Sequence, residues 1–188
     1  MEFKRFDIEG LIEIRPRMIE DDRGYFVEIF RLNDFLQHVP NVDFVQENQS
    51  LSVKAGTIRG LHFQTPPFAQ GKLVRCLVGK LLDVAVDLRS DSPTFGKSIS
   101  VILSPKENNQ LWIPAGFGHG FCSLESDSII SYRVTNYYSR DHDKGVAWDD
   151  PDIGVNWPEI ADPRTLSPKD RTQPKLAELP HYFSMKDS

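Results

Sequence analysis

The sequence predicts an all-β fold, a small barrel or jelly roll with a few short helices, and three observations carry this prediction. Short runs of β-branched and apolar residues recur along the chain, and clusters of turn residues separate them. The clearest helical pattern, at residues 33–39, is short. From Pro151 onward the chain is rich in proline, which predicts an ordered C-terminal extension of coil and a little helix around the barrel. Because no linker or repeat precedes this extension, we expect residues 1–188 to form a single domain.

The strongest strand patterns lie in the middle of the chain. Residues 72–78 and 81–88 flank a glycine, which predicts a hairpin between them. In the second run Asp83 and Asp87 fall on one face, so their carboxylates are expected to meet water or a polar cavity. Further strands are expected at 98–104, 110–113 and 129–135.

Composition excludes several classes of function. A net charge of -5 argues against broad nucleic-acid binding, which needs a basic face. The apolar runs are too short to span a bilayer, and the first residues lack the apolar stretch of a signal peptide. Cys76 and Cys122 lie in apolar, strand-like segments, which predicts buried free thiols. We therefore expect a cytoplasmic protein without nucleic-acid or membrane partners.

Two segments, 56–64 (GTIRGLHFQ) and 114–119 (PAGFGH), each place a histidine after glycines. Glycine permits backbone conformations that other residues avoid, and histidine titrates near neutrality. The two segments resemble the paired motifs of the cupin superfamily, whose fold is a small β-barrel or jelly roll. Three roles remain open for such histidines: metal ligation, proton transfer or packing.

The ligand set for a metal is incomplete. A metal-binding cupin offers His-x-His and a glutamate from the first motif and a histidine from the second. Here Gln64 stands two residues after His62, and Lys72 would place a cation where a metal needs an anion. His62 and His119 alone are too few ligands for a zinc or iron site, so no metal is expected.

Acid–base chemistry next to a carbonyl needs a base, a group that holds the enolate oxygen, and an acid on the opposite face. His62 qualifies as the base, Lys72 as the enolate partner and Tyr132 as the acid. A carboxylate bonded to the other ring nitrogen would fix the tautomer of the histidine. Asp170 and Asp83 both qualify by residue type, and the residues alone do not choose between them.

Eight motifs occur in order and with consistent spacing at 22–28, 46–50, 59–64, 71–74, 83–87, 113–121, 148–151 and 166–170. Through these motifs the chain resembles the dTDP-4-dehydrorhamnose 3,5-epimerase family over nearly its full length. The resemblance implies a cupin-fold homodimer that acts on dTDP-4-dehydro-6-deoxy-D-glucose without a metal or another cofactor.

The resemblance also assigns roles to residues. It implies that His62 is the base, paired with Asp170, that Tyr132 is the proton donor and that Lys72 steadies the enolate. The positions it implies in contact with the nucleotide-sugar are Arg23, Glu28, Gln46, Glu47, Asn48, Arg59, His119, Asp143 and Lys169.

Side-chain chemistry adds detail to these expected contacts. Arg23, Arg59 and Lys169 could hold a diphosphate even in an acidic protein. Phe26 and Tyr138 could pack on the thymine or the sugar, and for Phe26 packing in the core is an equal alternative. Two positions depart from the family pattern by one methylene, Glu47 in place of aspartate and Asp143 in place of glutamate.

The expected reaction is stepwise inversion at C3 and C5 of the 4-keto sugar, which gives dTDP-4-dehydro-L-rhamnose. The nearest alternative is an enzyme that epimerises one carbon, or isomerises the ketone, of a related dTDP-deoxysugar. A metal-dependent cupin oxygenase and a non-catalytic nucleotide-sugar binding module are the other classes considered.

Overall fold

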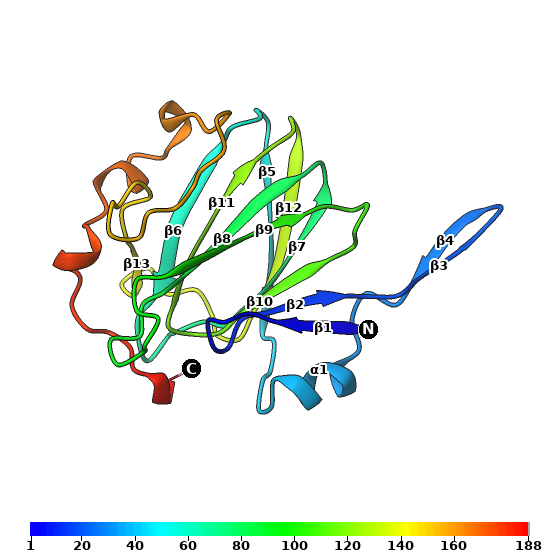
Figure 1. Ribbon diagram of the computed structural model, residues 1–188, viewed down its shortest axis with the longest axis horizontal. Helices are drawn as coiled ribbons and strands as arrows, with labels where there is room; N and C mark the ends of the chain where they lie inside the picture. The colour runs from blue at the N-terminus through cyan, green and yellow to red at the C-terminus, as the bar shows by residue number, and fades with distance from the viewer. Residues whose placement is uncertain (188) are drawn as a thin grey trace.

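The computed structural model describes residues 1–187 and has two antiparallel sheets packed face to face, a cupin-type β-barrel (Figure 1). The first sheet has the strand order β1 (Glu2–Arg5), β2 (Ile12–Arg15), β10 (Gln110–Ile113), β7 (Lys72–Val78), β12 (Ser128–Val134) and β5 (Gln46–Ser52). The second has the order β13 (Asp143–Gly145), β6 (Ile58–Gln64), β11 (Phe117–Ser123), β8 (Leu81–Asp87) and β9 (Ser98–Leu103). The expected all-β barrel is confirmed.

The main core lies between the two sheets. Val74 and Cys76 of β7 point inward from one sheet, and Ala85 and Phe121 point inward from the other. Since side chains alternate along a strand, Lys72 on β7 also points toward the interior. This alternation brings a charged residue to the inside of the barrel.

The predicted hairpin between residues 72–78 and 81–88 is wrong. β7 pairs with β10 and β12, whereas β8 pairs with β9 and β11, so the chain crosses from one sheet to the other at Gly79 and Lys80. Gly79 has a φ of 76°, and Ser128 packs against it so tightly that a Cβ would lie 2.3 Å from the hydroxyl oxygen. Gly79 correctly predicted a tight turn. The sheet that each flanking strand joins depends on packing between distant parts of the chain, which the residues around the turn do not predict.

The remaining predicted elements are confirmed to within a residue or two. The helix α1 spans Leu32–His38 and packs Phe35 onto Trp112, on the outer face of the six-stranded sheet. Cys76 and Cys122 are free and buried, and burial raises the pKa of both thiols to about 11. Among residues 1–187 no helix has the length and apolarity needed to cross a membrane.

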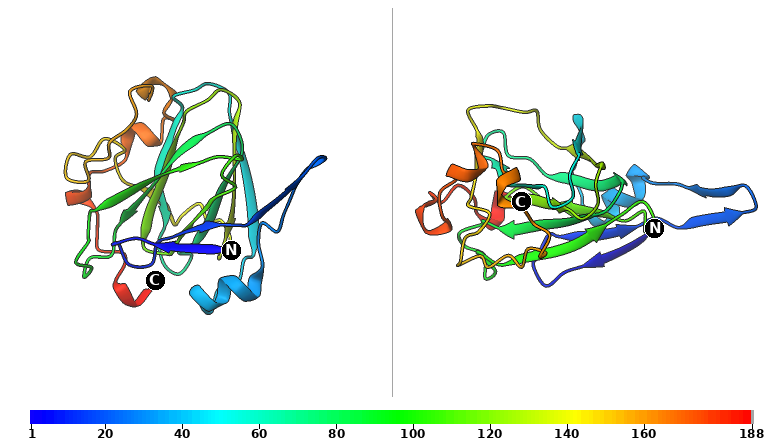
Figure 2. Two further views of the ribbon diagram at one scale, coloured as in Figure 1. Left: turned by 45° about the vertical axis from the view of Figure 1, so that its right-hand side comes forward. Right: turned by 90° about the horizontal axis from the view of Figure 1, so that it is seen from above.

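The C-terminal extension covers the outer face of the five-stranded sheet, where it appears in orange and red in Figure 2. Ile153, Leu176 and Phe183 pack on Val84 and Val86 of β8. Both faces of β8 are therefore buried, which explains its nearly continuous apolar sequence. The extension contains the short helical turns η1 (Pro163–Thr165), η2 (Asp170–Thr172), η3 (Leu176–Glu178) and η4 (Met185–Asp187).

A two-stranded arm, β3 (Met18–Asp21) and β4 (Gly24–Val27), projects from the barrel (Figures 1 and 2). It carries three large apolar side chains that are more than half exposed, Ile19, Tyr25 and Phe26. Exposed apolar surface of this kind on a projecting element is typical of an interface.

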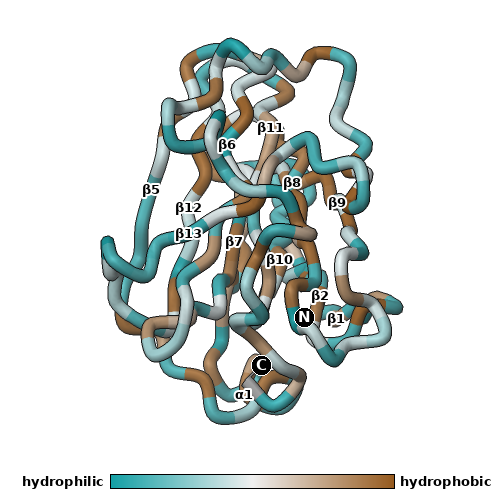
Figure 3. The backbone as a smooth tube through the Cα atoms, turned by 90° about the vertical axis from the view of Figure 1, so that its left-hand side faces the viewer, coloured by the Kyte–Doolittle hydropathy of each residue, from teal (hydrophilic) through white to brown (hydrophobic). Residues whose placement is uncertain are grey.

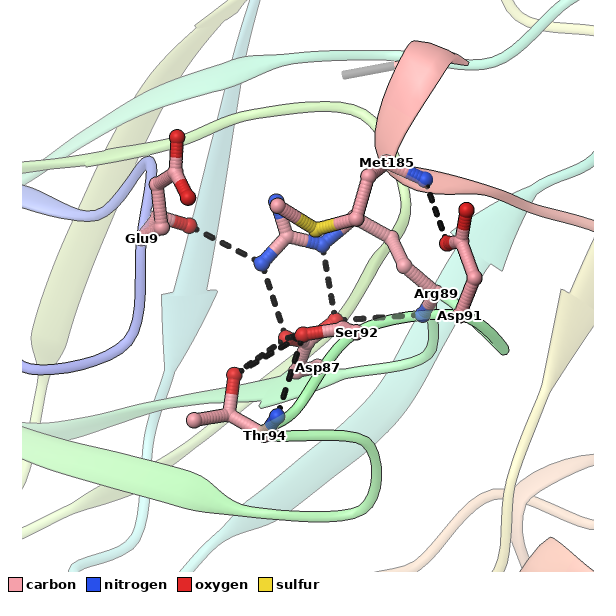
Figure 4. Close-up of polar contacts among 7 residues, drawn as sticks. All are labelled: Glu9, Asp87, Arg89, Asp91, Ser92, Thr94 and Met185. Atoms are coloured by element: carbon pink, nitrogen blue, oxygen red, sulfur yellow. Dashed lines mark hydrogen bonds and ion pairs between the residues drawn. The ribbon is translucent and has the colours of Figure 1, made fainter.

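A buried ion pair closes the end of β8 (Figure 4). The guanidinium of Arg89 donates two hydrogen bonds of 2.8 Å to Asp87, whose carboxylate also accepts from Ser92 and Thr94. Burial raises the pKa of Asp87, but these donors outweigh it and hold the pKa below its usual value. Arg89 also donates to the Glu9 carbonyl, so this network ties the strand to the N-terminal loop.

Candidate active site

A cavity of about 440 Å³ opens at one end of the barrel, between the two sheets. Its lining is Gln46, Asn48, Gln49, Ser50, His62, Phe63, Gln64, Gln70, Lys72, Tyr132, Tyr138 and Asp143. Strand β5 contributes much of the polar lining and is hydrophilic over most of its length (Figure 3). A larger cavity of about 730 Å³ lies beside α1, but no predicted catalytic residue lines it. We therefore take the cavity of about 440 Å³ as the candidate active site, because of the residues that line it and not because of its volume.

His62 and Asp170 form a hydrogen-bonded pair. His62 Nε2 lies 2.5 Å from Asp170 Oδ1, with the histidine side chain 34% exposed and the aspartate 4% exposed. Burial raises the pKa of Asp170, but hydrogen bonds from His62, Ser167 and the Gly60 backbone outweigh it and hold the pKa below its usual value. An ionised carboxylate only accepts hydrogen bonds, so Nε2 carries the proton and Nδ1 keeps a lone pair. Of the two aspartates left open by the sequence, Asp170 is the one that reaches His62.

Lys72 is buried between the sheets, 8% exposed, and its Nζ donates a long hydrogen bond of 3.4 Å to the His62 carbonyl oxygen. Burial lowers its pKa to about 8, although Asp143 and Asp83 oppose the shift. At pH 7 the side chain is thus mainly an ammonium group, and it titrates within the range in which enzymes are assayed.

Tyr132 lies on β12 of the six-stranded sheet, whereas His62 lies on β6 of the five-stranded sheet. Both line the cavity, so they approach it from opposite walls. Burial raises the pKa of Tyr132, so its hydroxyl keeps its proton at neutral pH. This is the arrangement that an acid and a base on opposite faces of a substrate require.

Polar residues at the rim of the cavity are linked to one another. Asp143 Oδ2 lies 2.5 Å from Lys169 Nζ and accepts a 3.2 Å hydrogen bond from the Tyr138 hydroxyl. Gln46 Nε2 donates to Asn48 Oδ1 at 2.8 Å. Five of the predicted substrate-binding residues are therefore gathered at one rim.

Gln64 has a structural task that its sequence position did not reveal. Its Nε2 donates to the carbonyl oxygens of Phe68 and Tyr137 at 2.7 and 3.1 Å, and its Oε1 accepts from the Ser139 backbone at 2.7 Å. The side chain is buried and holds two loops beside the cavity. Within residues 1–187, no three His, Cys, Asp or Glu side chains gather in a way that could hold a metal ion.

His119 lies opposite His62 on the neighbouring strand β11, yet it does not line the cavity. It is buried, with Nε2 2.8 Å from Oδ1 of the fully buried Asp83. Burial lowers the pKa of His119 despite the opposing effect of Asp83. The predicted contact between His119 and substrate stays a prediction.

The two histidine strands approach closely where both carry a glycine. A Cβ at Gly60 would lie 2.5 Å from the Gly120 Cα, and Gly60 has a φ of 132°. Only a residue without a side chain fits such a conformation and such a contact. These glycines therefore set the strand spacing beside His62 and His119.

Several predicted substrate-binding residues lie away from the cavity. Arg23 and Phe26 belong to the projecting arm and Glu28 follows it, where Arg23 pairs with Asp21. The other predicted substrate-binding residues outside the lining are Glu47, which accepts from Ser131 on the outer sheet face, Arg59, which donates to the Leu51 carbonyl, Lys169 at the rim, and His119, described above.

Five residues that line the cavity were not predicted as site residues: Gln49, Ser50, Phe63, Gln64 and Gln70. Ser50 could have been found, because it alternates with Gln46 and Asn48 on one face of β5. Gln70 lies in a loop and donates to the Asn136 carbonyl, a contact between distant segments with no local sequence signal.

Comparisons with known proteins point to one family. A profile of the dTDP-4-dehydrorhamnose 3,5-epimerase family matches residues 5–178. The epimerase of that name from Sinorhizobium fredii is 55% identical over 183 residues, which cover 97% of this chain and 93% of the relative.

Solved structures are similar along nearly the whole chain. A dTDP-6-deoxy-D-glucose-3,5-epimerase from Legionella pneumophila, in complex with dTDP-4-keto-L-rhamnose, has 38% identity and a TM-score of 0.88, covering 95% of this chain and 94% of that one. A 3'-monoepimerase from Streptomyces bikiniensis, in complex with dTDP-quinovose, has 33% identity and a TM-score of 0.88, covering 97% and 93%. The chain thus belongs to the dTDP-4-dehydrorhamnose 3,5-epimerase family.

Proposed function

We propose that this protein inverts C3 and C5 of dTDP-4-dehydro-6-deoxy-D-glucose and releases dTDP-4-dehydro-L-rhamnose. The observation that carries the proposal is the placement of His62, bonded to Asp170, and of Tyr132 on opposite walls of one cavity. Inversion needs a base and an acid on opposite faces of the same carbon.

In the proposed mechanism, Nδ1 of His62 removes the proton from the carbon next to the C4 ketone. The electron pair of the broken C–H bond moves toward the carbonyl, and Lys72 stabilises the enolate oxygen that forms. Tyr132 then donates its hydroxyl proton to the opposite face of the carbon. Solvent returns a proton to the tyrosinate and takes one from the imidazolium, which restores the site.

Asp170 acts by holding His62 in the tautomer with Nε2 protonated and by stabilising the imidazolium. The same steps serve C3 and C5, because the single ketone acidifies both neighbouring carbons. The reaction is redox-neutral, so the proposal needs no cofactor.

A homodimer is part of the proposal. Arg23 and Phe26, expected at the substrate, lie on an arm that leaves its own barrel, and the arm exposes large apolar side chains. We infer that the arm packs on a second copy of the chain and completes that copy's substrate site.

A mixing experiment tests the exchange of arms. Arg23→Ala and His62→Asn variants are each expected to have low activity, whereas mixed dimers contain one cavity with both residues intact. Recovered activity after mixing supports the exchange. Activity that stays at the level of the separate variants contradicts it.

The reaction itself is tested by NMR of the product formed in D2O. Deuterium at both C3 and C5 is expected, and deuterium at one carbon would instead favour the monoepimerase that the Streptomyces bikiniensis relative exemplifies. Tyr132→Phe should reduce inversion more than deuterium exchange. Equal losses of both would contradict the role of Tyr132 as the acid.

A cytoplasmic location is also proposed, and the two buried free cysteines support it. Fractionation of the source cells with antibody detection tests this location, and recovery in the secreted or membrane fraction would contradict it.

A further inference from the structure

Lys72 is a buried cation with little hydrogen bonding of its own. An ammonium group has three N–H donors, yet the hydrogen bond found for Nζ among residues 1–187 is the long one to the His62 carbonyl. A buried charge is costly unless another charge or strong hydrogen bonds compensate for it. Lys72 therefore depends on a counter-charge inside the barrel.

Two carboxylates act on Lys72. Asp143, on β13, is already paired with Lys169 and also accepts from Tyr138 at the partly exposed rim. The Lys169 ammonium thus already offsets the charge of Asp143, and the same ammonium lowers the pKa of Lys72. The other titratable groups around Lys72 are His62 on β6, His119 on β11 and Tyr132 on β12.

Asp83 is the other carboxylate, and within residues 1–187 no ion pair with a lysine or an arginine is found for it. It is 0% exposed and points inward from β8, on the face of the five-stranded sheet that Ala85 shares. Its Oδ1 accepts from His119, while its Oδ2 is a buried oxygen for which no hydrogen-bond partner exists among residues 1–187. Burial lowers the pKa of His119, so at neutral pH its ring is not a cation that could offset the Asp83 carboxylate.

We propose that Asp83, held by His119, is a positioning residue that keeps Lys72 charged from the opposite sheet. Neither Asp83 nor His119 is among the residues that line the cavity, so their proposed effect is on Lys72. The inference rests on the proposed function insofar as that function gives the Lys72 ammonium its task at the enolate.

The direct test is the titration of Lys72 in the ligand-free protein, followed by 13C NMR of the lysine Cε and assigned by the signal lost in Lys72→Arg. Asp83→Asn removes the charge but keeps the shape and an acceptor for His119. It should lower the Lys72 midpoint by on the order of one pH unit, since an opposite charge nearby favours the charged form. An unchanged midpoint would overturn the proposal.

Asp87→Asn is the matched control. Asp87 is a buried carboxylate on the same strand, but Arg89, Ser92 and Thr94 satisfy it. This variant should lose stability without moving the Lys72 midpoint. An equal shift in both variants would mean that Asp83 acts only through the structure, and the proposal would fail.

Activity adds a second readout. The alkaline limb of kcat/KM should move to lower pH in Asp83→Asn by the same amount as the Lys72 midpoint, with activity recovered on the acid side. If the Lys72 midpoint shifts but the alkaline limb of kcat/KM does not move, Asp83 remains the counter-charge and the enolate role of Lys72 is refuted. Failure of the Asp83 proposal and failure of the proposed function are thus distinguishable.

If Asp83→Asn shows no cooperative thermal transition, His119→Gln carries the test. That variant leaves the Asp83 carboxylate charged, so the Lys72 midpoint should hold or rise. A fall of the midpoint would overturn the proposal.

Discussion

Two histidine–aspartate pairs lie side by side in this barrel, on adjacent strands and in direct register, yet their surroundings differ. His62 is one-third exposed at the cavity and takes its carboxylate, Asp170, from the C-terminal extension. His119 is buried and takes Asp83 from the next strand of its own sheet. The same two residue types thus form one pair in contact with the cavity and one pair that is buried and absent from the cavity lining. Access to the cavity, more than residue identity, distinguishes the two pairs.

The largest difference between the pairs is expected in catalysis. His62→Asn should lower kcat by about 10²- to 10⁴-fold, the range that a positioned general base contributes. Turnover is measured by NMR of the sugar product at saturating substrate. A loss below tenfold would remove His62 from the role of base and with it the contrast between the pairs.

Asp170→Asn should have the next largest effect, a decrease in kcat of about 10²-fold or more, because an amide no longer fixes the tautomer of His62 or stabilises the imidazolium. The matched comparison is Asp83→Asn, assayed at a pH low enough to keep Lys72 charged, which should retain much more activity. Similar losses in both variants at that pH would mean that the two pairs share one role.

Gly60→Ala tests the close approach of the strands that carry the two histidines. The added methyl would meet the Gly120 backbone in a φ region unfavourable to alanine. We expect a loss of about 1–3 kcal/mol in the free energy of unfolding, measured by denaturant titration. Gly24→Ala on the arm also has positive φ but meets no atom of its own chain within 4 Å, so it lacks the backbone clash of Gly60→Ala. Equal losses in both variants would contradict a packing constraint at Gly60.

The smallest expected effect concerns stability and pH. Burial lowers the pKa of His119, so the folded protein keeps this ring neutral where the unfolded chain takes up a proton, below about pH 6.5. The unfolded state therefore gains stability as the pH falls through that value. His119→Gln lacks this contribution, so its Tm should fall less than that of the wild type between pH 7 and pH 5, by a few degrees. Parallel Tm curves would contradict a buried neutral His119.

Local patterns predicted the strands and α1, because alternation and turn chemistry are written in adjacent residues. The shared face of Asp83 and Asp87 on β8 was expected to meet water or a polar cavity, and this is wrong, because both side chains are fully buried and neither lines the cavity. The pairing of β7 with β8 was predicted wrongly, because Gly79 favours a turn between the two strands but does not determine whether they join the same sheet. The partner of His62 was a choice between Asp83 and Asp170 until the family resemblance was considered, because the contact spans 108 residues of sequence. The buried position of His119 also had no local signal, because the residues around it predict a strand but do not predict which of its side chains reach the cavity.

Gln64 links the chemistry of the site to its architecture. In sequence it stands where a metal-binding cupin has a histidine, but here the amide anchors the loops on either side of the cavity mouth through three hydrogen bonds. An imidazole has two ring nitrogens and cannot reproduce two donated bonds and one accepted bond in that geometry. Converting this barrel to metal chemistry would therefore require a new loop architecture as well as new ligands, so the two kinds of cupin are separated by more than one substitution.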